Sequence, residues 1–261
     1  MQASVVIRAR DEAAAIGRTL DRLAAQDVEH EVVVVDSGSR DGTPAIARGR
    51  GARVMEIAPA EFTYGRALNR GAAQARAPVV VALSAHALPP DGGWLGRVVA
   101  HFDDPAVACA SGDRRDERHR PLDGPVRQDA AGLERNPFWG YSNAAGGFRA
   151  DLWRERPFRE DLPGTEDREW ARWALSRGHV CVIDPALVVE HDHSREGLRA
   201  SFRRYEREAR GFAMFLDLPP YRARHALAEW WTDRGWHRSR ARARLDPRRM
   251  ARLAGKWRGR R

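Results

Sequence analysis

Short apolar runs alternate with segments of helical periodicity along the first ninety residues. Residues 4–8, 31–36 and 78–83 carry uninterrupted apolar runs, whereas residues 16–23 place their large apolar side chains on one helical face. Unbroken apolar runs are typical of strands that are covered on both faces, as in parallel sheets. The alternation predicts an α/β fold: a doubly wound, mostly parallel sheet flanked by helices and built from right-handed βαβ units.

The pattern changes in the second half of the chain. Residues 112–136 are too polar for a core element and are predicted to form a surface loop. A helix is predicted to begin near Thr165, which is positioned to cap it. Residues 180–194 predict a strand pair, and residues 195–217 predict a further helix.

Length and cysteine content narrow the class of protein. At 261 residues, the chain is long enough for one large α/β domain with an appendage. No window is apolar and long enough to span a bilayer, and the N-terminus leads directly into a charged strand, so we expect neither a membrane anchor nor a signal peptide. Cys109 and Cys181 lie among small apolar residues, which predicts buried thiols of a cytoplasmic protein.

The positive charge is concentrated at the C-terminal end. Residues 222–261 contain 14 Arg or Lys and 3 Asp or Glu, a net charge of +11 in a chain whose total is +9, and they include two predicted amphipathic helices. Such a basic helical appendage can bind nucleic acid, lie on an anionic membrane surface, or pack as a solvated or dimer-forming helix pair. The charge alone leaves these three alternatives open.

Polar residues follow several predicted strands directly. They include Arg10 and Glu12 after the first strand, Asp36 after the second, and Ser84 and His86 after residues 78–83. Because ligands of open α/β sheets bind outside the carboxyl ends of the strands, these side chains are expected at one rim. There Asp36 can contact a nucleobase or a ribose, or can form an Asx turn with its own loop.

Three histidines suggest a metal site at the same rim. His191 and His193 are two residues apart in an extended segment, so both imidazoles are expected on one face, near His86. Nitrogen ligation of a divalent cation is consistent with this set, but the chain has no H-E-x-x-H or C-x-x-C pattern. The alternative is that His86 is a structural residue.

A second candidate is the stretch LPGTEDREWARWAL. It places Glu166 and Asp167 in the first turn of the predicted helix, where acids either complement the helix dipole or, beside aromatic side chains, act as a general base. Trp170 and the nearby Trp139 offer stacking surfaces for a sugar ring, or belong to the core.

Taken together, these segments resemble the family 2 inverting glycosyltransferases with the GT-A fold. The resemblance covers about residues 3–215 and is carried by SVVIRARDEAAAIGRTLDRLAAQ, EVVVVDSGSRDGT, FTYGRALNRGAAQARAPVVVALSAHALP, GTEDREWARWAL and VVEHDHS. It favours a bacterial cell-envelope glycan or rhamnosyltransferase-like branch, located in the cytoplasm or peripherally on the inner face of the membrane. It implies a nucleotide-diphosphate sugar as donor and a hydroxyl of a glycan, a lipid-linked glycan or a small molecule as acceptor.

The resemblance also implies residue roles. Asp167 would be the general base, and the acceptor would be bound by Trp94, Trp139, Glu166 and Trp170. The nucleotide-sugar would be bound by Arg10, Glu12, Asp36, Arg66, Ser84 and His86. The implied domains are a transferase domain over residues 1–217, with a donor half (1–111) and an acceptor half (112–217), and a basic tail over residues 218–261.

The chain departs from the family at one motif. Where most members have Asp-x-Asp, this sequence has Ser84-Ala85-His86, so the first metal-binding carboxylate is missing. A divalent cation, Mn²⁺ or Mg²⁺, would be held by His86 with His191 or His193, or mainly by the diphosphate, or would be dispensable. The alternatives to a glycosyltransferase are a nucleotidyltransferase, whose Gly-rich loop with a basic residue is absent after the first strand, and a nucleic-acid-binding protein acting through the tail. Homodimerisation is also left open.

Overall fold

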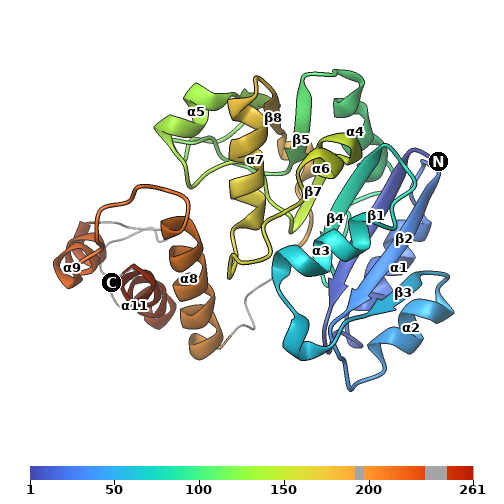
Figure 1. The fold of residues 1–261 in the computed structure, drawn as a ribbon, viewed down its shortest axis with the longest axis horizontal. Helices are drawn as coiled ribbons and strands as arrows, with labels where there is room; N and C mark the ends of the chain where they lie inside the picture. Colours follow the sequence, from blue (N-terminus) through green and yellow to red (C-terminus); the bar gives the residue numbers. More distant parts are fainter. Residues whose placement is uncertain (192–196, 233–245, 261) are drawn as a thin grey trace. The chain divides into compact units, whose positions relative to one another are not determined.

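The computed structural model describes residues 1–191, 197–232 and 246–260, which Figure 1 shows as a ribbon coloured along the sequence. The chain divides into two compact units. Unit 1 consists of Met1–Glu160 with Asp167–Asp192, and unit 2 consists of Asp161–Glu166 with His193–Arg261. No helix in the described ranges is long and apolar enough to cross a membrane.

Unit 1 is built on one sheet with the strand order β3-β2-β1-β4-β7-β5-β8-β6. Strands β7 and β6 run antiparallel to their neighbours, and the other pairs are parallel, which confirms the predicted mostly parallel sheet. The strands are β1 (Ala3–Ala9), β2 (His30–Asp36), β3 (Arg53–Glu56), β4 (Val79–Ser84), β5 (Val107–Ser111), β6 (Val126–Gln128), β7 (Ala145–Arg149) and β8 (Val180–Ile183).

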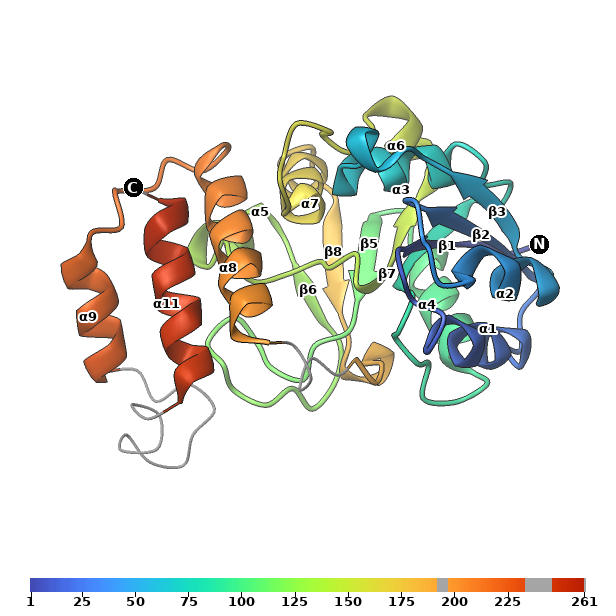
Figure 2. The same ribbon diagram turned by 90° about the horizontal axis from the view of Figure 1, so that it is seen from below.

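Helices cover both faces of this sheet (Figure 2). Val5 and Ile7 of β1 point into one core layer and Val6 into the other, as the two-residue period of a strand requires. The first layer is closed by α1 (Ile16–Ala24), α2 (Thr43–Gly49) and α4 (Trp94–Ala100). The second is closed by α3 (Tyr64–Ala72), α5 (Ala130–Arg135), α6 (Ala150–Glu155) and α7 (Glu166–Ser176).

The cysteines lie on two neighbouring strands close to the β6 edge of this sheet. Cys109 of β5 and Cys181 of β8 are register partners, both are free thiols, and both are completely buried. Burial raises the pKa of the Cys109 thiol well above its usual range. The prediction of buried thiols is confirmed.

Two predictions for the second half of the chain were wrong. The polar stretch 112–136 contains β6 and α5, because an edge strand is held by backbone bonds to β8 and tolerates polar side chains. The described part of the predicted strand pair, residues 180–191, contains a single strand, β8, because Asp184 then caps a short 3₁₀ helix (Pro185–Leu187). Beyond this 3₁₀ helix, Glu190 forms an isolated antiparallel bridge with Leu88, outside the sheet.

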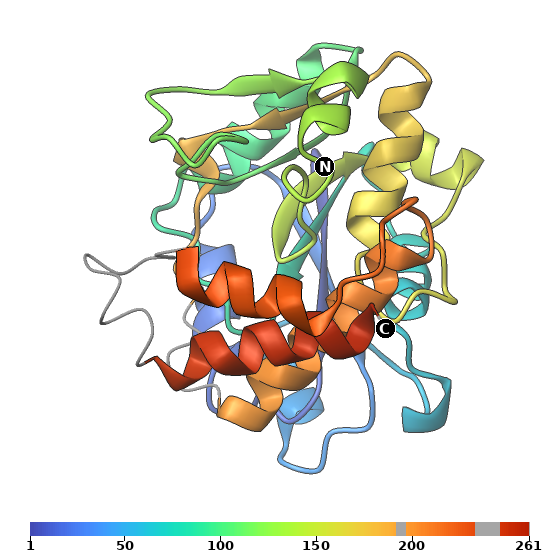
Figure 3. The same cartoon turned by 90° about the vertical axis from the view of Figure 1, so that its left-hand side faces the viewer.

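Unit 2 contains α8 (Leu198–Ala213), α9 (Ala223–Thr232) and α11 (Pro247–Gly259), with α11 between the other two (Figure 3). A Cβ atom at Gly255 would lie 2.5 Å from the carbonyl oxygen of Phe202, and one at Gly259 would meet that of Glu206. Glycines thus let α11 approach the α8 backbone closely. For this reason α8 belongs with the tail helices, and the unit boundary differs from the one predicted at residue 217.

A polar cluster joins α9 to α11. Glu229 accepts hydrogen bonds from the Tyr221 hydroxyl (2.6 Å) and from Lys256 Nζ (2.8 Å), and Arg249 donates to the carbonyl oxygens of Glu229 and Trp230. Burial acts to raise the pKa of Glu229, but the hydrogen bonds from Lys256 and Tyr221 outweigh it and leave that pKa below the usual glutamate range.

The lowered pKa predicts a pH-dependent contribution to stability. A depressed folded-state pKa means that ionised Glu229 stabilises the fold above the unfolded pKa of about 4.3, and that this contribution is lost as pH falls through the folded value. We expect Glu229→Gln to lower the melting temperature at pH 7, and the difference from wild type to shrink below about pH 4. Thermal unfolding followed by circular dichroism measures this. Glu134→Gln, which removes an exposed ion pair with Arg172, is the control, and a pH-independent difference for Glu229→Gln would contradict the prediction.

Candidate active site

The carboxyl ends of β1, β2 and β4 meet at one edge of the sheet. Ala9 is the register partner of Asp36, and Arg8 is the register partner of Ser84. The strand ends singled out from the sequence therefore lie side by side, as parallel neighbours require.

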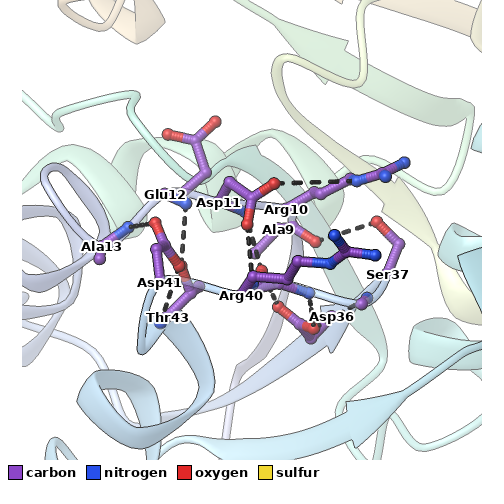
Figure 4. Close-up of polar contacts among 12 residues, drawn as sticks. Ala9, Arg10, Asp11, Glu12, Ala13, Asp36, Ser37, Arg40, Asp41 and Thr43 are labelled. Atoms are coloured by element: carbon purple, nitrogen blue, oxygen red, sulfur yellow. Dashed lines mark hydrogen bonds and ion pairs between the residues drawn. The ribbon is translucent and has the colours of Figure 1, made fainter.

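The loops after β1 and β2 are joined by hydrogen bonds (Figure 4). The Arg40 amide donates to Asp11 Oδ1 (2.8 Å), and the Glu12 amide donates to Thr43 Oγ1 (2.8 Å). Asp11 has a positive φ of 53°, a conformation that aspartate tolerates better than most residues. This network fixes the backbone from which Glu12 projects.

Asp36 organises the loop that follows it. Its carboxylate is 1% exposed and accepts hydrogen bonds from the amides of Gly38 (3.0 Å) and Ser39 (2.9 Å) and from the Ser39 hydroxyl. Gly38 has φ +86°, and a Cβ atom there would lie 2.6 Å from Pro59. Asp36 therefore forms an Asx turn with its own loop in this structure. A contact of Asp36 with a nucleotide stays a prediction.

His86 lies at the centre of a polar cluster on the rim. Glu12 Oε1 lies 3.0 Å from His86 Nδ1, and His191 Nε2 lies 2.9 Å from His86 Nε2, with the two imidazole rings stacked at a centroid distance of 4.7 Å. Ser84 Oγ is 3.4 Å from the same Nε2 atom. The structure thus brings His86 and His191 together, whereas His193 lies outside the described residues.

The carboxylate of Glu12 sets the electrostatics of this cluster. Its hydrogen bond raises the pKa of His86, and this effect outweighs burial, which acts in the opposite direction. The same hydrogen bond places a proton on Nδ1 of His86, so the lone pair of its Nε2 atom points away from Glu12. In the part of the chain that the structure describes, no group of three or more His, Cys, Asp or Glu side chains could hold a metal ion.

Asp167 is tied to the end of β4 by the loop before β7. The Asn143 amide donates to Asp167 Oδ2 (3.1 Å), and the Ser84 amide donates to the Ala144 carbonyl oxygen (2.8 Å). Oδ1 of Asp167 accepts from the Arg168 amide at the start of α7 (2.8 Å). The carboxylate is therefore held through its own backbone and through residues 142–144.

The predicted cap of α7 is corrected. Thr165 has φ +69° and its hydroxyl bonds to the Gly164 carbonyl, whereas a capping residue has an extended backbone and accepts amide protons from the helix.

Two residues of this region were not found from the sequence. The side chain of Asn143 is 2% exposed, and neither its Oδ1 nor its Nδ2 has a hydrogen-bond partner within the described residues. Arg8 donates to the Tyr64 carbonyl oxygen (3.2 Å), and its guanidinium lies 5.1 Å from the Tyr64 ring centroid. An arginine within an apolar strand is a signal that would have identified Arg8, but no local pattern marks Asn143.

The two other arginines predicted for nucleotide binding are placed differently. Arg66 pairs with Glu160 (2.7 Å) at the start of α3, and Arg10 lies at the surface within 4.0 Å of Asp11. A contact of either arginine with a donor stays a prediction.

The three tryptophans predicted to contact the acceptor are buried in this structure. Trp94 and Trp170 are completely buried, and their indole N–H groups donate to the carbonyl oxygens of Leu187 and Arg156. Trp139 is 8% exposed and donates to a backbone carbonyl in the same way. These rings pack in the core, and their contact with an acceptor stays a prediction. Glu166, the fourth predicted acceptor residue, is likewise buried, at 3% exposed.

The mixed sheet with helices on both faces is the GT-A fold. A model of glycosyl transferase family 2 matches residues 4–178, two thirds of the chain. The chain belongs to glycosyl transferase family 2 and is a transferase enzyme. Among curated proteins, no match was found.

Solved structures share this fold at low sequence identity. The mannosyltransferase PcManGT from Pyrobaculum calidifontis, in complex with GDP-Man and Mn²⁺, is 24% identical, with 96% of this chain and 73% of that chain covered and a TM-score of 0.67. TarS residues 1–349 from S. aureus is 17% identical, with 95% and 71% covered and a TM-score of 0.60. A complex of that protein with UDP-GlcNAc has a TM-score of 0.58.

Proposed function

We propose that this enzyme is an inverting glycosyltransferase that moves a hexosyl or deoxyhexosyl group from a nucleotide-diphosphate sugar to an acceptor hydroxyl. The observation that carries the proposal is the loop 142–144, which joins the Asp167 carboxylate to the end of β4 and so to the His86 cluster. A base on one side and a polar rim on the other are what in-line displacement at a sugar carbon requires.

Asp167 acts as the general base. It takes the proton of the acceptor hydroxyl, whose oxygen forms a bond to the anomeric carbon while the bond from that carbon to the diphosphate oxygen breaks. The electron pair of the broken bond leaves with the nucleoside diphosphate, and the configuration of the sugar is inverted. The amides of Asn143 and Arg168 keep the carboxylate oriented during this step.

The donor occupies the rim of strand ends. GDP-Man and UDP-GlcNAc in the complexes of similar fold support a nucleotide-sugar as its chemical class. Arg8, on the same face of the sheet as Ser84, supplies positive charge close to the position where the first carboxylate of the Asp-x-Asp motif is missing. The nucleotide would lie along the loops that carry Arg10, Glu12 and Asp36, with Arg66 beside them.

The residues of the rim fit a divalent cation that is bound together with the diphosphate. His86 and His191 present two Nε2 atoms 2.9 Å apart, which is about the separation of adjacent nitrogen ligands on one cation. The Nδ1 atom of His86, which would face away from the cation, is hydrogen-bonded to the carboxylate of Glu12. Histidines that bind metals commonly form such a hydrogen bond to a carboxylate. Mn²⁺ or Mg²⁺ held by His86 with His191 or His193 would neutralise charge on the leaving diphosphate.

The acceptor is proposed to be a hydroxyl of a glycan, a lipid-linked glycan of the bacterial cell envelope, or a small molecule, and the enzyme is proposed to act peripherally on the inner face of a membrane. The basic helices of unit 2 support the membrane association, because they combine arginines with exposed apolar side chains.

Product analysis tests the function directly. The purified protein is incubated with GDP- and UDP-sugars, with and without Mn²⁺, and the released nucleotide is identified. A glycosyltransferase releases the nucleoside diphosphate, even when water replaces the acceptor, whereas a nucleotidyltransferase acting on a nucleoside triphosphate releases pyrophosphate. Release of pyrophosphate from a triphosphate, with no cleavage of any nucleotide-sugar, would overturn the proposal.

Asn143 provides a further prediction for the same site. A buried amide without a hydrogen-bond partner among the described residues costs stability, so we infer that Asn143 binds a sugar hydroxyl once substrate binding exposes it. Asn143→Ala is expected to keep or raise the melting temperature while lowering kcat/KM by about 10-fold, equal to one hydrogen bond of about 1.4 kcal/mol. Steady-state kinetics and thermal unfolding measure both effects, and Asn136→Ala is the control. A loss of stability with unchanged kcat/KM would mean that Asn143 is structural.

A further inference from the structure

An apolar groove lies between α9 and α11 in unit 2. It has a volume of about 330 Å³, and all eight residues that line it are apolar. Each helix contributes four of them at the spacing i, i+3, i+4 and i+7, which is one face of a helix. They are Ala223, Ala226, Leu227 and Trp230 of α9, and Met250, Leu253, Ala254 and Trp257 of α11.

Polar contacts connect the two helices that form the groove. The bonds of Arg249 to α9 carbonyl oxygens and the Glu229–Lys256 ion pair connect the two helices without using the side chains that line the groove. Leu227 is 65% exposed and Met250 is 56% exposed. Two large apolar side chains are thus exposed to water at this groove. Covering them with an apolar group lowers the free energy of the system.

The surroundings of the groove are positively charged. The described residues 222–232 and 246–260 contain eight Arg or Lys and two Asp or Glu, a net charge of +6. Arg222, Arg224 and Arg248 are exposed, whereas Arg258 pairs with Glu206 of α8. Glu229, one of the two acids, accepts hydrogen bonds from Lys256 and Tyr221. An apolar groove bordered by guanidinium groups matches a ligand with an apolar chain and an anionic head.

We propose that this groove binds one acyl chain of an anionic phospholipid in a bilayer, while the surrounding arginines contact the phosphate headgroups. The proposal deepens the membrane association proposed above and is independent of the transfer chemistry. Tryptophans at the groove, Trp230 and Trp257, suit the interface between headgroups and chains, where an amphipathic ring is favoured.

Vesicle binding of the full chain tests the proposal. Wild type is expected to co-sediment with phosphatidylglycerol-containing vesicles and at least ~10-fold less with pure phosphatidylcholine vesicles, because each basic residue near the surface contributes about 1 kcal/mol. Leu227→Glu and Met250→Glu place a charge in the groove at exposed positions that the fold does not need. Each is expected to weaken binding at least ~10-fold relative to Ala228→Glu, an equal change of charge at an exposed α9 position outside the groove.

A second measurement identifies the acyl chain as the occupant. Vesicles with brominated acyl chains are expected to quench the tryptophan fluorescence of wild type, and Trp257→Phe or Leu227→Glu is expected to reduce this quenching. Equal weakening by Leu227→Glu and Ala228→Glu, or no quenching, would overturn the proposal and leave charge alone as the cause of binding. A doubled mass in light scattering that Leu227→Glu abolishes would instead assign the groove to a second copy of the chain.

The same variants separate this inference from the transferase proposal. Cleavage of nucleotide-sugar in water is expected to be unchanged in Leu227→Glu and Met250→Glu. Loss of vesicle binding with intact cleavage supports the groove proposal, and absence of cleavage in every protein, wild type included, would overturn the transferase proposal alone.

Discussion

Replacement of Asp167 by asparagine is expected to lower kcat at least ~10²-fold, the usual scale for loss of a general base, which corresponds to about 2.7 kcal/mol of barrier. The amide that replaces the carboxylate is not basic enough to take the acceptor proton. The wild-type carboxylate accepts hydrogen bonds from the backbone amides of Asn143 and Arg168. The asparagine side chain has a single oxygen and can accept only one of them, so we also expect a loss of about 1 kcal/mol in the free energy of unfolding. Single-turnover kinetics and calorimetric binding of the nucleoside diphosphate separate chemistry from donor affinity.

The chain offers a matched control for this substitution. Asp151 stands near the start of α6, is exposed, and accepts the amide of the next residue at 2.8 Å, as Asp167 does. Asp151→Asn is expected to leave kcat within twofold, because Asp151 follows the end of β7 that pairs with the start of β4, at the opposite edge of the sheet from the rim. Turnover of Asp167→Asn near that of wild type would remove this residue from the mechanism.

The second large effect is expected at His86. Mn²⁺ should strengthen binding of the nucleoside diphosphate, and His86→Ala should abolish that strengthening, a change of ~10-fold or more, while metal-free binding stays within a few-fold of wild type. The reason is that the chain has serine where the family's first carboxylate stands, so the rim binds a cation well only when the diphosphate adds its own oxygens. Titration calorimetry with and without Mn²⁺, in wild type and variant, measures the four affinities.

A histidine outside the rim is the control for His86. His30 at the start of β2 has its ring nitrogen Nδ1 2.8 Å from the Val28 carbonyl oxygen, at the opposite end of β2 from Asp36, so His30→Ala should keep the full Mn²⁺ effect. Four identical affinities for wild type and His86→Ala would mean that transfer is metal-independent and that the histidines donate hydrogen bonds to the phosphates.

Local sequence was sufficient to predict the parallel half of the sheet. The runs in β1, β2 and β4 are unbroken because each strand is covered on both faces, and the polar residues that follow each run mark its carboxyl end. Strand β6 and helix α5 were missed because an edge strand needs no apolar pattern. Its stability comes from backbone pairing to β8, a strand more than fifty residues further along the chain.

The candidate site depended more strongly on tertiary structure. The contacts of His86 with Glu12 and with His191 span 74 and 105 residues, and that of Asn143 with Asp167 spans 24. Side chains at such separations are brought together only by the order of strands in the sheet. The same holds for Trp94 and Trp170, because an aromatic residue suits a sugar-binding surface and a core equally well, and only its packing decides between them.

The sequence by itself therefore determined the class of fold, the rim at the strand ends and the basic character of the C-terminal helices, since apolar periodicity, turn residues and charge are properties of neighbouring residues. Only the tertiary structure decided that Glu12 holds His86, that Asn143 lies buried beside Asp167, and that α8 packs with α11 through Gly255 and Gly259. These are contacts between distant segments, and their free energies depend on burial and distance, which no local pattern encodes.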